Sequence, residues 1–300
     1  MRLADDAVHE EPGDSPAALA AFQRERGRLF GIAYRMLGSV REAEDVLQDA
    51  YVRWHGVDHA AVAHAPAYLA QMVTRLCLDA LKSAHARRTE YYGVWLPEPL
   101  VGAADDDPAA VHELAEDLSL AFLLMLERLT PVERAVFLLR ESFGFSHREV
   151  AGVVGKSEDN CRQIERRARQ RLAEAKRPVP ADPAEHDRLL GQFLTAVRDG
   201  DMEGLLEVLA EDATAYSDGG GKVLAARNPI FGADKVARFF LGIRSKGGAE
   251  WEARLVPVNG RTGMVGMVEG HPHGVLAIQV EDGRIRSVFL VVNPDKLPPE

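Results

Sequence analysis

Arginine and glutamine side chains near residue 160 are the residues of this chain best suited to reading DNA. In the major groove, arginine can donate two hydrogen bonds to guanine, and glutamine can pair in a similar way with adenine. The candidates for such base contacts are Arg162, Gln163 and Arg166. Neighbouring cations and a hydroxyl are suited to phosphate contacts: Lys156, Ser157, Arg167 and Arg169. The competing interpretation is a solvated helix face that binds nothing.

A helix-turn-helix is predicted to position these side chains. Capping boxes at Thr130 and Ser146, each followed by glutamate three residues later, begin its first two helices. Gly155 ends the second helix, and Ser157 can cap the third. The third helix carries one apolar stripe, which faces away from most of its arginines: Cys161, Ile164, Ala168 and Leu172. A basic helix in this setting enters a DNA major groove.

The base in this region contrasts with the acidic composition of the whole chain. Its 300 residues carry a net charge of −10, which argues against a general nucleic-acid coat protein, and 46% of them are hydrophobic. This length allows two or three hydrophobic cores. Only two cysteines are present, and the first residues are acidic and polar, so we expect neither a disulfide framework nor a signal peptide. No apolar run approaches the roughly twenty residues of a membrane span, and a cytoplasmic protein is therefore expected.

Three helices are predicted before the helix-turn-helix, at residues 17–37, 39–54 and 66–88. Gly38 ends the first, and a third capping box at Ser39 begins the second. The second helix is predicted to bury Tyr51 and to expose an acidic side. An extended linker follows at about residues 89–108, with an acidic run at its end: Asp105, Asp106 and Asp107. A helix near 111–128 then leads into the helix-turn-helix, and the proline-rich segment 177–183 marks the next boundary.

The last third of the chain changes from helical to alternating periodicity. Helices are predicted at 184–198, 202–210 and 233–244, with a short strand at 214–216 and a glycine loop at 218–222. Four strands follow, at 251–258, 263–269, 274–281 and 285–292. Asn259-Gly260 and Asp282-Gly283 are strong hairpin turns. We expect an α+β domain in which a curved antiparallel sheet wraps a helix, a fold that often encloses a pocket.

The order of the helical parts resembles an extracytoplasmic-function (ECF) sigma factor of the sigma-70 family. EAEDVLQDAYVRW resembles the region 2 surface that docks on the β′ clamp of core RNA polymerase, which implies Asp45, Gln48 and Asp49 as polymerase contacts. YLAQMVTRLCLDALKSAHARR resembles the helix that melts and reads the −10 promoter element. The residues that this resemblance implies are Arg75, Asp79, Lys82, Arg87 and Arg88. Many members have asparagine where Arg75 stands, which affects the detailed −10 preference. The helix-turn-helix resembles region 4, which reads the −35 element.

The C-terminal domain resembles SnoaL-like folds, and one ECF subgroup carries such an extension. Three motifs support this resemblance: WLPEP at Trp95–Pro99, DGGGK at Asp218–Lys222 and NPDKL at Asn293–Leu297. It implies regulation in cis, without a separate anti-sigma factor. The residues assigned to this role are Trp95, Pro97, Glu98, Asp218, Gly219, Gly220, Gly221, Lys222, Asn293, Pro294, Asp295 and Lys296.

The motif segments carry further expectations. DGGGK lacks the spacing of phosphate-binding loops, so its glycines are predicted to form a positive-φ turn from which Asp218 and Lys222 contact the sigma modules. NPDKL is predicted to be an exposed tail that docks and releases. The acidic run of the linker either enters the nucleic-acid channel of polymerase or is simply solvated. An acid–base pocket of Tyr216, Asp218, His271 and His273 is a minor alternative, and the two histidines lack a third metal ligand.

The expected molecule is a multidomain, non-enzymatic sigma factor. Its predicted division is a disordered N-terminus (1–14), sigma region 2 (15–92), a linker (93–110), sigma region 4 (111–177), a second linker (178–183), a SnoaL-like domain (184–292) and a tail (293–300). The expected partners are the β and β′ subunits of core RNA polymerase and promoter DNA, with no cofactor, metal or membrane. Two alternatives stay open: a ligand-sensing DNA-binding regulator that does not dock on polymerase, with a small-molecule ligand in the SnoaL-like domain, and a SnoaL-type cyclase or isomerase.

Overall fold

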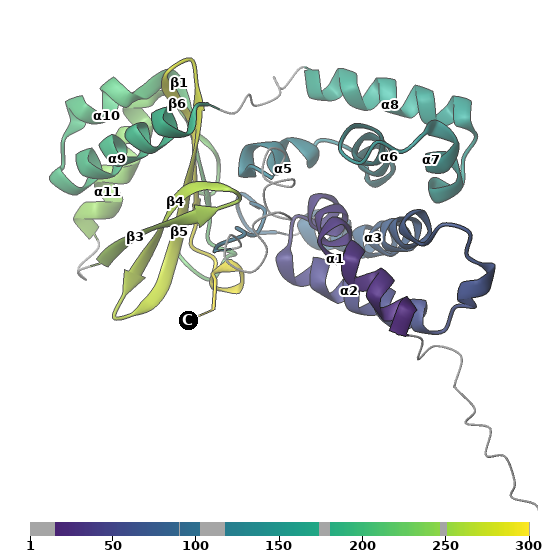
Figure 1. Cartoon of the computed structure of the whole chain (residues 1–300). Coiled ribbons are helices and arrows are strands. Elements are labelled where there is room, and N and C mark those ends of the chain that lie inside the picture. Colours follow the sequence, from purple (N-terminus) through teal and green to yellow (C-terminus); the bar gives the residue numbers. More distant parts are fainter. Residues whose placement is uncertain (1–15, 90, 103–117, 174–180, 247–250, 300) are drawn as a thin grey trace, which may run out of the picture.

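The computed structural model describes residues 16–89, 91–102, 118–173, 181–246 and 251–299, apart from the side chains of 83–89, 246 and 251. The helices within residues 16–173, the helical part, lie on one side of the sheet that the C-terminal part of the chain forms (Figure 1). The predicted disordered N-terminus, the acidic run Asp105–Asp107 and the first part of the predicted helix 111–128, residues 111–117, lie outside the described residues, as does most of the proline-rich boundary.

The first three helices follow the predicted pattern. They are α1 (Pro16–Leu37), α2 (Val40–His55) and α3 (Ala65–Thr89), with a short 3-10 helix, η1 (His59–Ala61), before α3. Gly38 has φ of 68° and ends α1, as expected of a residue without a Cβ atom. Tyr51 differs from its prediction: it remains exposed on α2, where its ring edge packs against Phe22.

The helix-turn-helix is confirmed in its local details. It comprises α6 (Pro131–Glu141), α7 (His147–Val154) and α8 (Glu158–Ala173), preceded by α5 (Leu120–Leu126). Both predicted capping boxes form, and Gly155 takes the left-handed conformation that ends α7. The buried apolar residues of α1–α3 and of the helix-turn-helix belong to one continuous core. The two predicted helical modules therefore pack directly against each other.

The last part is an α+β domain with one six-stranded sheet. Its helices are α9 (Pro183–Asp199), α10 (Met202–Val208) and α11 (Ala233–Lys246). Its strands are β1 (Leu209–Asp218), β2 (Ile230–Phe231), β3 (Trp251–Val258), β4 (Arg261–Val268), β5 (His271–Glu281) and β6 (Arg284–Val291), followed by a 3-10 helix, η2 (Pro294–Lys296). The strand order is β2-β1-β6-β5-β4-β3.

The sheet is mixed, whereas the sequence predicts a wholly antiparallel sheet. The strands β3 to β6 form the expected antiparallel meander, but β1 pairs with β6 in parallel. A parallel pair needs a crossover, and here α11 and the meander lie between the two strands in the sequence. The short strand predicted at 214–216 is part of the longer strand β1, which pairs with both β2 and β6.

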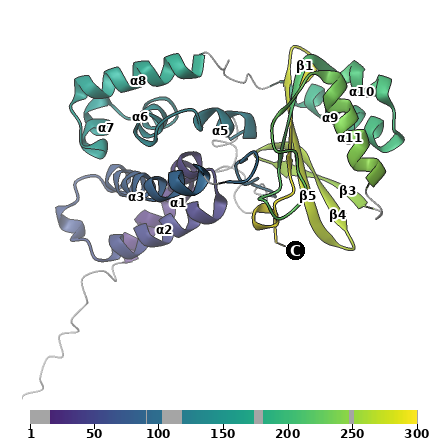
Figure 2. The same cartoon turned by 180° about the vertical axis from the view of Figure 1, so that it is seen from behind.

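The two faces of the sheet have different neighbours. Ala213 and Ala215 of β1 are buried with Phe193 of α9 and Phe240 of α11 in one core. The alternate residues of β1 point to the opposite face, because strand side chains alternate. This opposite face, which we call the outer face, is turned toward the helical part, whereas α9, α10 and α11 cover the other one (Figure 2).

Candidate nucleic-acid interface and interdomain contacts

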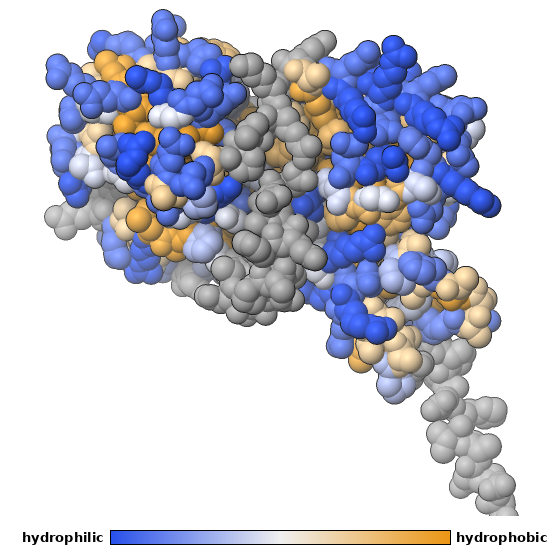
Figure 3. Space-filling model, turned by 45° about the horizontal axis from the view of Figure 1, so that its top comes forward, coloured by the Kyte–Doolittle hydropathy of each residue, from blue (hydrophilic) through white to orange (hydrophobic). Residues whose placement is uncertain are grey.

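The solvent side of α8 and the turn before it carry the side chains predicted to touch the −35 element. Cys161, Ile164, Ala168 and Leu172 are buried, which fixes the opposite side of the helix outward. The exposed candidates are Lys156, Ser157, Arg162, Gln163, Arg166, Arg167 and Arg169. The surface of the helical part around α8 is largely hydrophilic (Figure 3). The geometry is therefore that of a basic helix free to enter a groove.

The arginines of α8 differ in their local partners. Arg162 pairs with Asp159 at 2.7 Å and with Glu158 at 3.3 Å, both in the first turn of α8. Arg169 pairs with Glu165 at 2.8 Å and also with Glu141. Arg166 and Arg167 form no ion pair among the described residues. The exposed pairs of Arg162 contribute at most about 1 kcal/mol, so a phosphate can displace them.

A buried glutamate holds the three helices of the helix-turn-helix together. Glu165 of α8 lies 2.6 Å from His147 Nε2 of α7 and 3.8 Å from the guanidinium of Arg140 on α6. Its side chain is only 8% exposed. Partly buried ion pairs of this kind depend on good geometry, and this one fixes α8 against α6 and α7. Sequence reasoning missed this residue because its partners are distant in the chain.

Three of the residues predicted to read the −10 element, Arg75, Asp79 and Lys82, lie on α3 and are exposed. The Arg75 guanidinium donates to the carbonyl oxygens of Gly152 at 2.7 Å and Val153 at 3.2 Å, at the C-terminal end of α7. Asp79 pairs with Lys82 at 2.7 Å on the exposed side of α3, and this hydrogen bond lowers the pKa of Asp79. The remaining two candidates, Arg87 and Arg88, lie in α3, but their side chains are outside the described residues.

The predicted polymerase contacts lie on the solvent side of α2. Asp45, Gln48 and Asp49 are exposed. Val52, one turn further along the helix, is 66% exposed and adds an apolar group to this acidic surface. An acidic surface with one apolar residue is suited to a basic protein partner, because charge steers the encounter and apolar burial stabilises the complex.

The three sequence motifs converge on one buried carboxylate, that of Asp218, on the outer face at the end of β1. Its Oδ1 accepts hydrogen bonds from the Tyr91 hydroxyl at 2.5 Å and from the Gly220 amide at 2.9 Å. Its Oδ2 accepts from the Leu96 amide at 2.9 Å and from Lys296 Nζ at 2.8 Å. We call these residues, together with Asn293, the motif network.

The tail motif NPDKL is only partly exposed, in contrast to its prediction: Pro294 and Asp295 face solvent, but Asn293 and Lys296 point into the protein. The side chain of Lys296 is 11% exposed, and its Nζ donates to Leu96 O at 2.6 Å as well as to Asp218. Asn293 is buried, and its Nδ2 donates to the Tyr91 hydroxyl at 2.9 Å. The tail docks because Lys296 neutralises a carboxylate that is otherwise buried without a counter-charge. Pro294 begins the short helix η2, which aims Lys296 inward.

The glycine motif forms the tight loop that the sequence predicts, with one changed contact. Gly220 and Gly221 have φ of 63° and 71°. A Cβ atom on Gly220 would lie 2.5 Å from the Asn293 side chain, and one on Gly219 would lie 2.3 Å from Val223 O, so neither position accepts a side chain. Lys222 is predicted to contact the sigma modules, but it forms no hydrogen bond or ion pair with them among the described residues. It pairs with Asp295 at 2.6 Å, which fastens the loop to the tail.

The linker motif WLPEP is docked on the turn between α1 and α2. A Cβ atom on Gly38 would lie 2.7 Å from the Trp95 ring, so the ring packs directly on this glycine. One carboxylate oxygen of Glu98 accepts from the Val40 amide at 2.9 Å and the Ser39 hydroxyl at 2.7 Å, and Pro97 is buried beside it. Ser39 caps α2 as predicted, by accepting from the Glu42 amide, and Glu98 of the linker adds a carboxylate to this cap.

A second polar contact joins the sheet domain to the core of the helical part. Asn259, in the turn between β3 and β4, is buried and donates to the Tyr34 hydroxyl at 2.7 Å and to Leu118 O at 2.8 Å. The Tyr34 hydroxyl in turn donates to Glu98 O at 2.6 Å. Burial raises the pKa of Tyr34 far above its ordinary value. Sequence reasoning placed Asn259 only in a hairpin turn, because no local pattern reveals a partner 225 residues away.

The structure does not assemble the alternative acid–base pocket. Tyr216 lines a cavity on the outer face, while Asp218 is held by the motif network. His273 lies at the edge of an apolar cavity of about 280 Å³ on the other face, beside Phe193 and Phe240. The described residues contain no group of three or more side chains suited to a metal ion. Within the described part of the chain, no helix combines the length and apolarity that crossing a membrane requires.

Comparison with known proteins gives the same organisation. A model of sigma-70 region 2 matches residues 21–88, and a model of sigma-70 region 4 matches residues 119–172. The ECF RNA polymerase sigma factor SigJ of Mycobacterium tuberculosis is 37% identical over 289 residues, covering 93% of this chain and 92% of SigJ. The probable ECF sigma factor SigI of the same species is 33% identical, covering 93% of this chain and 94% of SigI. The crystal structure of SigJ superposes with a TM-score of 0.76 at 36% identity, covering 93% of this chain and 97% of SigJ.

Proposed function

Because the chain belongs to the ECF sigma factors of the sigma-70 family, which direct transcription initiation as alternative sigma factors, we propose that its SnoaL-like domain regulates this activity within the same chain. The observation that carries the proposal is the motif network. The Asp218 carboxylate of the C-terminal domain receives hydrogen bonds from the linker, through Tyr91 and Leu96, and from the tail, through Lys296.

The network is placed to act on the two DNA-reading modules together. Through Trp95 and Glu98, the linker is bound to the turn that begins α2. Through Asn259, the sheet domain is bound both to Tyr34 of α1 and to the backbone just before α5. The C-terminal domain thus fastens region 2 and region 4 in the arrangement in which they share a core. We propose that it restrains their separation.

Promoter recognition requires that separation. The −10 and −35 elements lie roughly 25 base pairs apart, which is about 85 Å at about 3.4 Å per base pair. In the structure, α3 touches α7, since Gln71 and Arg75 donate to the Gly152 carbonyl at 3.2 and 2.7 Å. In this arrangement, the two modules cannot reach the −10 and −35 elements at the same time. We assign the structure to the form that precedes promoter binding.

We further propose roles for the exposed residues. Asp45, Gln48 and Asp49 bind core RNA polymerase. Arg162, Gln163 and Arg166 contact −35 bases, with Lys156, Ser157, Arg167 and Arg169 on phosphates. Arg75, Asp79, Lys82, Arg87 and Arg88 serve −10 recognition once the modules separate. A restraint within the chain makes a separate anti-sigma factor unnecessary.

In vitro transcription with core RNA polymerase tests the regulatory proposal. Asp218→Asn keeps the shape of the side chain but removes the charge that binds Lys296, so we expect transcription from the cognate promoter to rise several-fold. Asp234→Asn, which affects an exposed pair with Arg238 on α11, is the matched control and should change transcription little. Equal transcription from wild type and Asp218→Asn would contradict regulation through this network.

Core polymerase pull-down tests the assignment of α2. Asp45→Ala combined with Asp49→Ala should weaken holoenzyme formation, while Asp212→Ala, an exposed carboxylate on β1 of the C-terminal domain, should leave it unchanged. A DNA-binding regulator that acts without polymerase is the alternative function. It would bind core polymerase neither as wild type nor as the variant, and the sigma-factor relatives over 93% of the chain disfavour it.

A further inference from the structure

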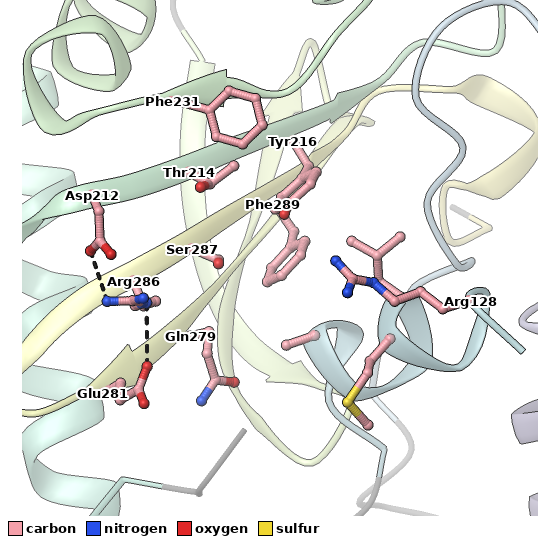
Figure 4. Close-up of a pocket in the computed structure, with 13 residues that line it drawn as sticks. Arg128, Asp212, Thr214, Tyr216, Phe231, Gln279, Glu281, Arg286, Ser287 and Phe289 are labelled. Carbon is pink, nitrogen blue, oxygen red and sulfur yellow. Dashed lines mark hydrogen bonds and ion pairs between the residues drawn. The ribbon is translucent and has the colours of Figure 1, made fainter. Parts of the chain in front are cut away.

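A cavity of about 550 Å³ lies on the outer face of the sheet, between β1, β2, β5, β6 and α5. It therefore has one wall from the C-terminal domain and one from α5, which lies within region 4 (Figure 4). Its volume is within the range of small-molecule sites. It is separate from the apolar cavity beneath α9 and α11, which lies on the opposite face of the sheet.

The wall formed by the sheet is aromatic. The rings of Tyr216 and Phe289 are stacked, with centroids 5.4 Å apart and planes inclined by 6°. Phe231 stands at the edge of the cavity and is 62% exposed, which is unusual for a phenylalanine. Leu124 and Met125 of α5 line the opposite wall. A flat aromatic group would gain both burial and ring stacking between these walls.

The two arginines that line the cavity differ in whether their guanidinium groups have ion-pair partners. Arg286 pairs with Asp212 at 2.7 Å and with Glu281 at 3.3 Å. The guanidinium of Arg128, which follows α5, forms no ion pair or hydrogen bond among the described residues, although the Arg128 amide donates to Met125 O. Figure 4 shows its guanidinium reaching from the α5 side toward Tyr216 and Phe289. One cation in the cavity thus lacks a counter-charge within the described part of the chain.

The Tyr216 hydroxyl is a second donor beside this cation. Burial raises the pKa of Tyr216, and the positive charge of Arg128 acts in the opposite direction, so the two groups interact electrostatically. The hydroxyl remains protonated near neutral pH and has no hydrogen-bond partner among the described residues. A guanidinium and a hydroxyl that face the same space are complementary to a carboxylate.

We propose that this cavity binds a small planar aromatic carboxylate, with its ring against Tyr216 and Phe289 and its carboxylate between Arg128 and the Tyr216 hydroxyl. Such a ligand touches the C-terminal domain and the end of α5 at once. It would therefore couple a small molecule to the position of region 4. This regulatory consequence rests on the proposed function, whereas the binding itself does not.

Isothermal titration calorimetry of the full chain with 2-naphthoate tests the binding. We expect saturable one-site binding, at least about tenfold weaker for the neutral 2-naphthamide, because hydrogen bonds to a charged group are stronger than those between neutral groups. Arg128→Gln should weaken 2-naphthoate binding by about tenfold or more, Arg128→Lys by less, and Tyr216→Phe by a smaller factor than Arg128→Gln. Arg238→Gln, which changes an arginine on α11, is the matched control and should bind as wild type does.

Three outcomes would overturn the proposal. They are the absence of saturable heat up to millimolar 2-naphthoate, equal affinity for the acid and the amide, and unchanged affinity in folded Arg128→Gln. Transcription assays with 2-naphthoate separate this site from the proposed function. Binding without a change in transcription would remove the coupling and leave the site. Failure to bind would remove the site and leave the Asp218→Asn test of regulation in place.

Discussion

Asp218 shows how one residue can join segments that are far apart in the sequence. Its side chain is fully buried, and its two oxygens are occupied by four donors from the linker, its own loop and the tail. A buried carboxylate is tolerated only when it is paired and hydrogen-bonded. The network is therefore interdependent, since the loss of one donor leaves charge without compensation.

Asp218→Asn should destabilise the chain strongly. The substitution leaves the Lys296 ammonium, which is 11% exposed, without its counter-charge, and breaking a buried pair costs about 3–5 kcal/mol. Urea unfolding with domain-specific probes measures this loss. Asp295→Asn removes the exposed pair with Lys222 and should cost about 1 kcal/mol or less. Equal losses in the two variants would show that the burial of Asp218 is not what matters.

Alkaline pH should unfold the chain by ionising Tyr34 and Tyr91. Burial raises both pKa values in the folded state, above an unfolded value of about 10. The folded state then holds more protons above that pH, so the stabilisation is complete below about pH 10 and is lost as pH rises further. Each group contributes a slope of at most about 1.4 kcal/mol per pH unit. Between pH 9 and 11, the free energy of unfolding measured with urea should fall less steeply with pH in Tyr34→Phe than in wild type. An identical pH dependence in the two proteins would contradict the assignment.

At the scale of elements, α2 depends on a cap from outside its own segment. The carboxylate of Glu98 accepts from the first amides of α2, which are otherwise without partners at a helix N-terminus. Its negative charge also interacts favourably with the helix dipole. The helix proposed to contact polymerase thus begins at a group that the linker supplies.

Glu98→Gln should loosen the first turn of α2. We expect about 1 kcal/mol of local destabilisation, because the charge at the cap is lost. Hydrogen–deuterium exchange should become faster at Val40 and Arg41. The matched control is Glu149→Gln, which changes a capping box contained within α7, and its effect should stay in α7. Faster exchange in α2 for both variants would contradict a specific cap by Glu98.

Elements with local signals could be predicted, and those set by distant contacts could not. The capping boxes at Thr130 and Ser146 and the turn at Asn259 follow from neighbouring residues, and all three form. The parallel pairing of β1 with β6 joins strands with α11 between them, which no local pattern encodes. The same limit applies to the site. The spacing along α8 predicts which arginines face solvent, whereas the docking of Lys296 depends on a carboxylate 78 residues away.

At the scale of the whole molecule, the two DNA-reading modules are held closer than a promoter permits. The core they share, the contacts of Arg75 with α7 and the bond from Arg134 to Met36 O at 2.7 Å all belong to this arrangement. We propose that polymerase and promoter binding together supply the energy that separates the modules.

Distance measurements between spin labels test this separation. Labels at Arg24→Cys on α1 and Gln170→Cys on α8 use exposed positions, and the native Cys77 and Cys161 are buried. Double electron–electron resonance should give a single distance between the two labels in the free chain. With core polymerase and promoter DNA, this distance should increase by about 30 Å or more, because the −10 and −35 elements are far apart. Unsubstituted protein should take up no label. An unchanged distance in the holoenzyme would contradict the assignment of the structure to a form that precedes promoter binding.

The position of Lys296 in the chain has a consequence for synthesis. Domains fold as they leave the ribosome, N-terminal parts first. The helices α1 to α8 are complete long before Lys296 is made, so Asp218 waits for its counter-charge until the tail emerges. For that interval each new molecule has both of its DNA-reading modules but lacks its restraint. Slower translation of the codons that precede Lys296 would lengthen the interval, so the proposed regulation by this network begins only after Lys296 has been made.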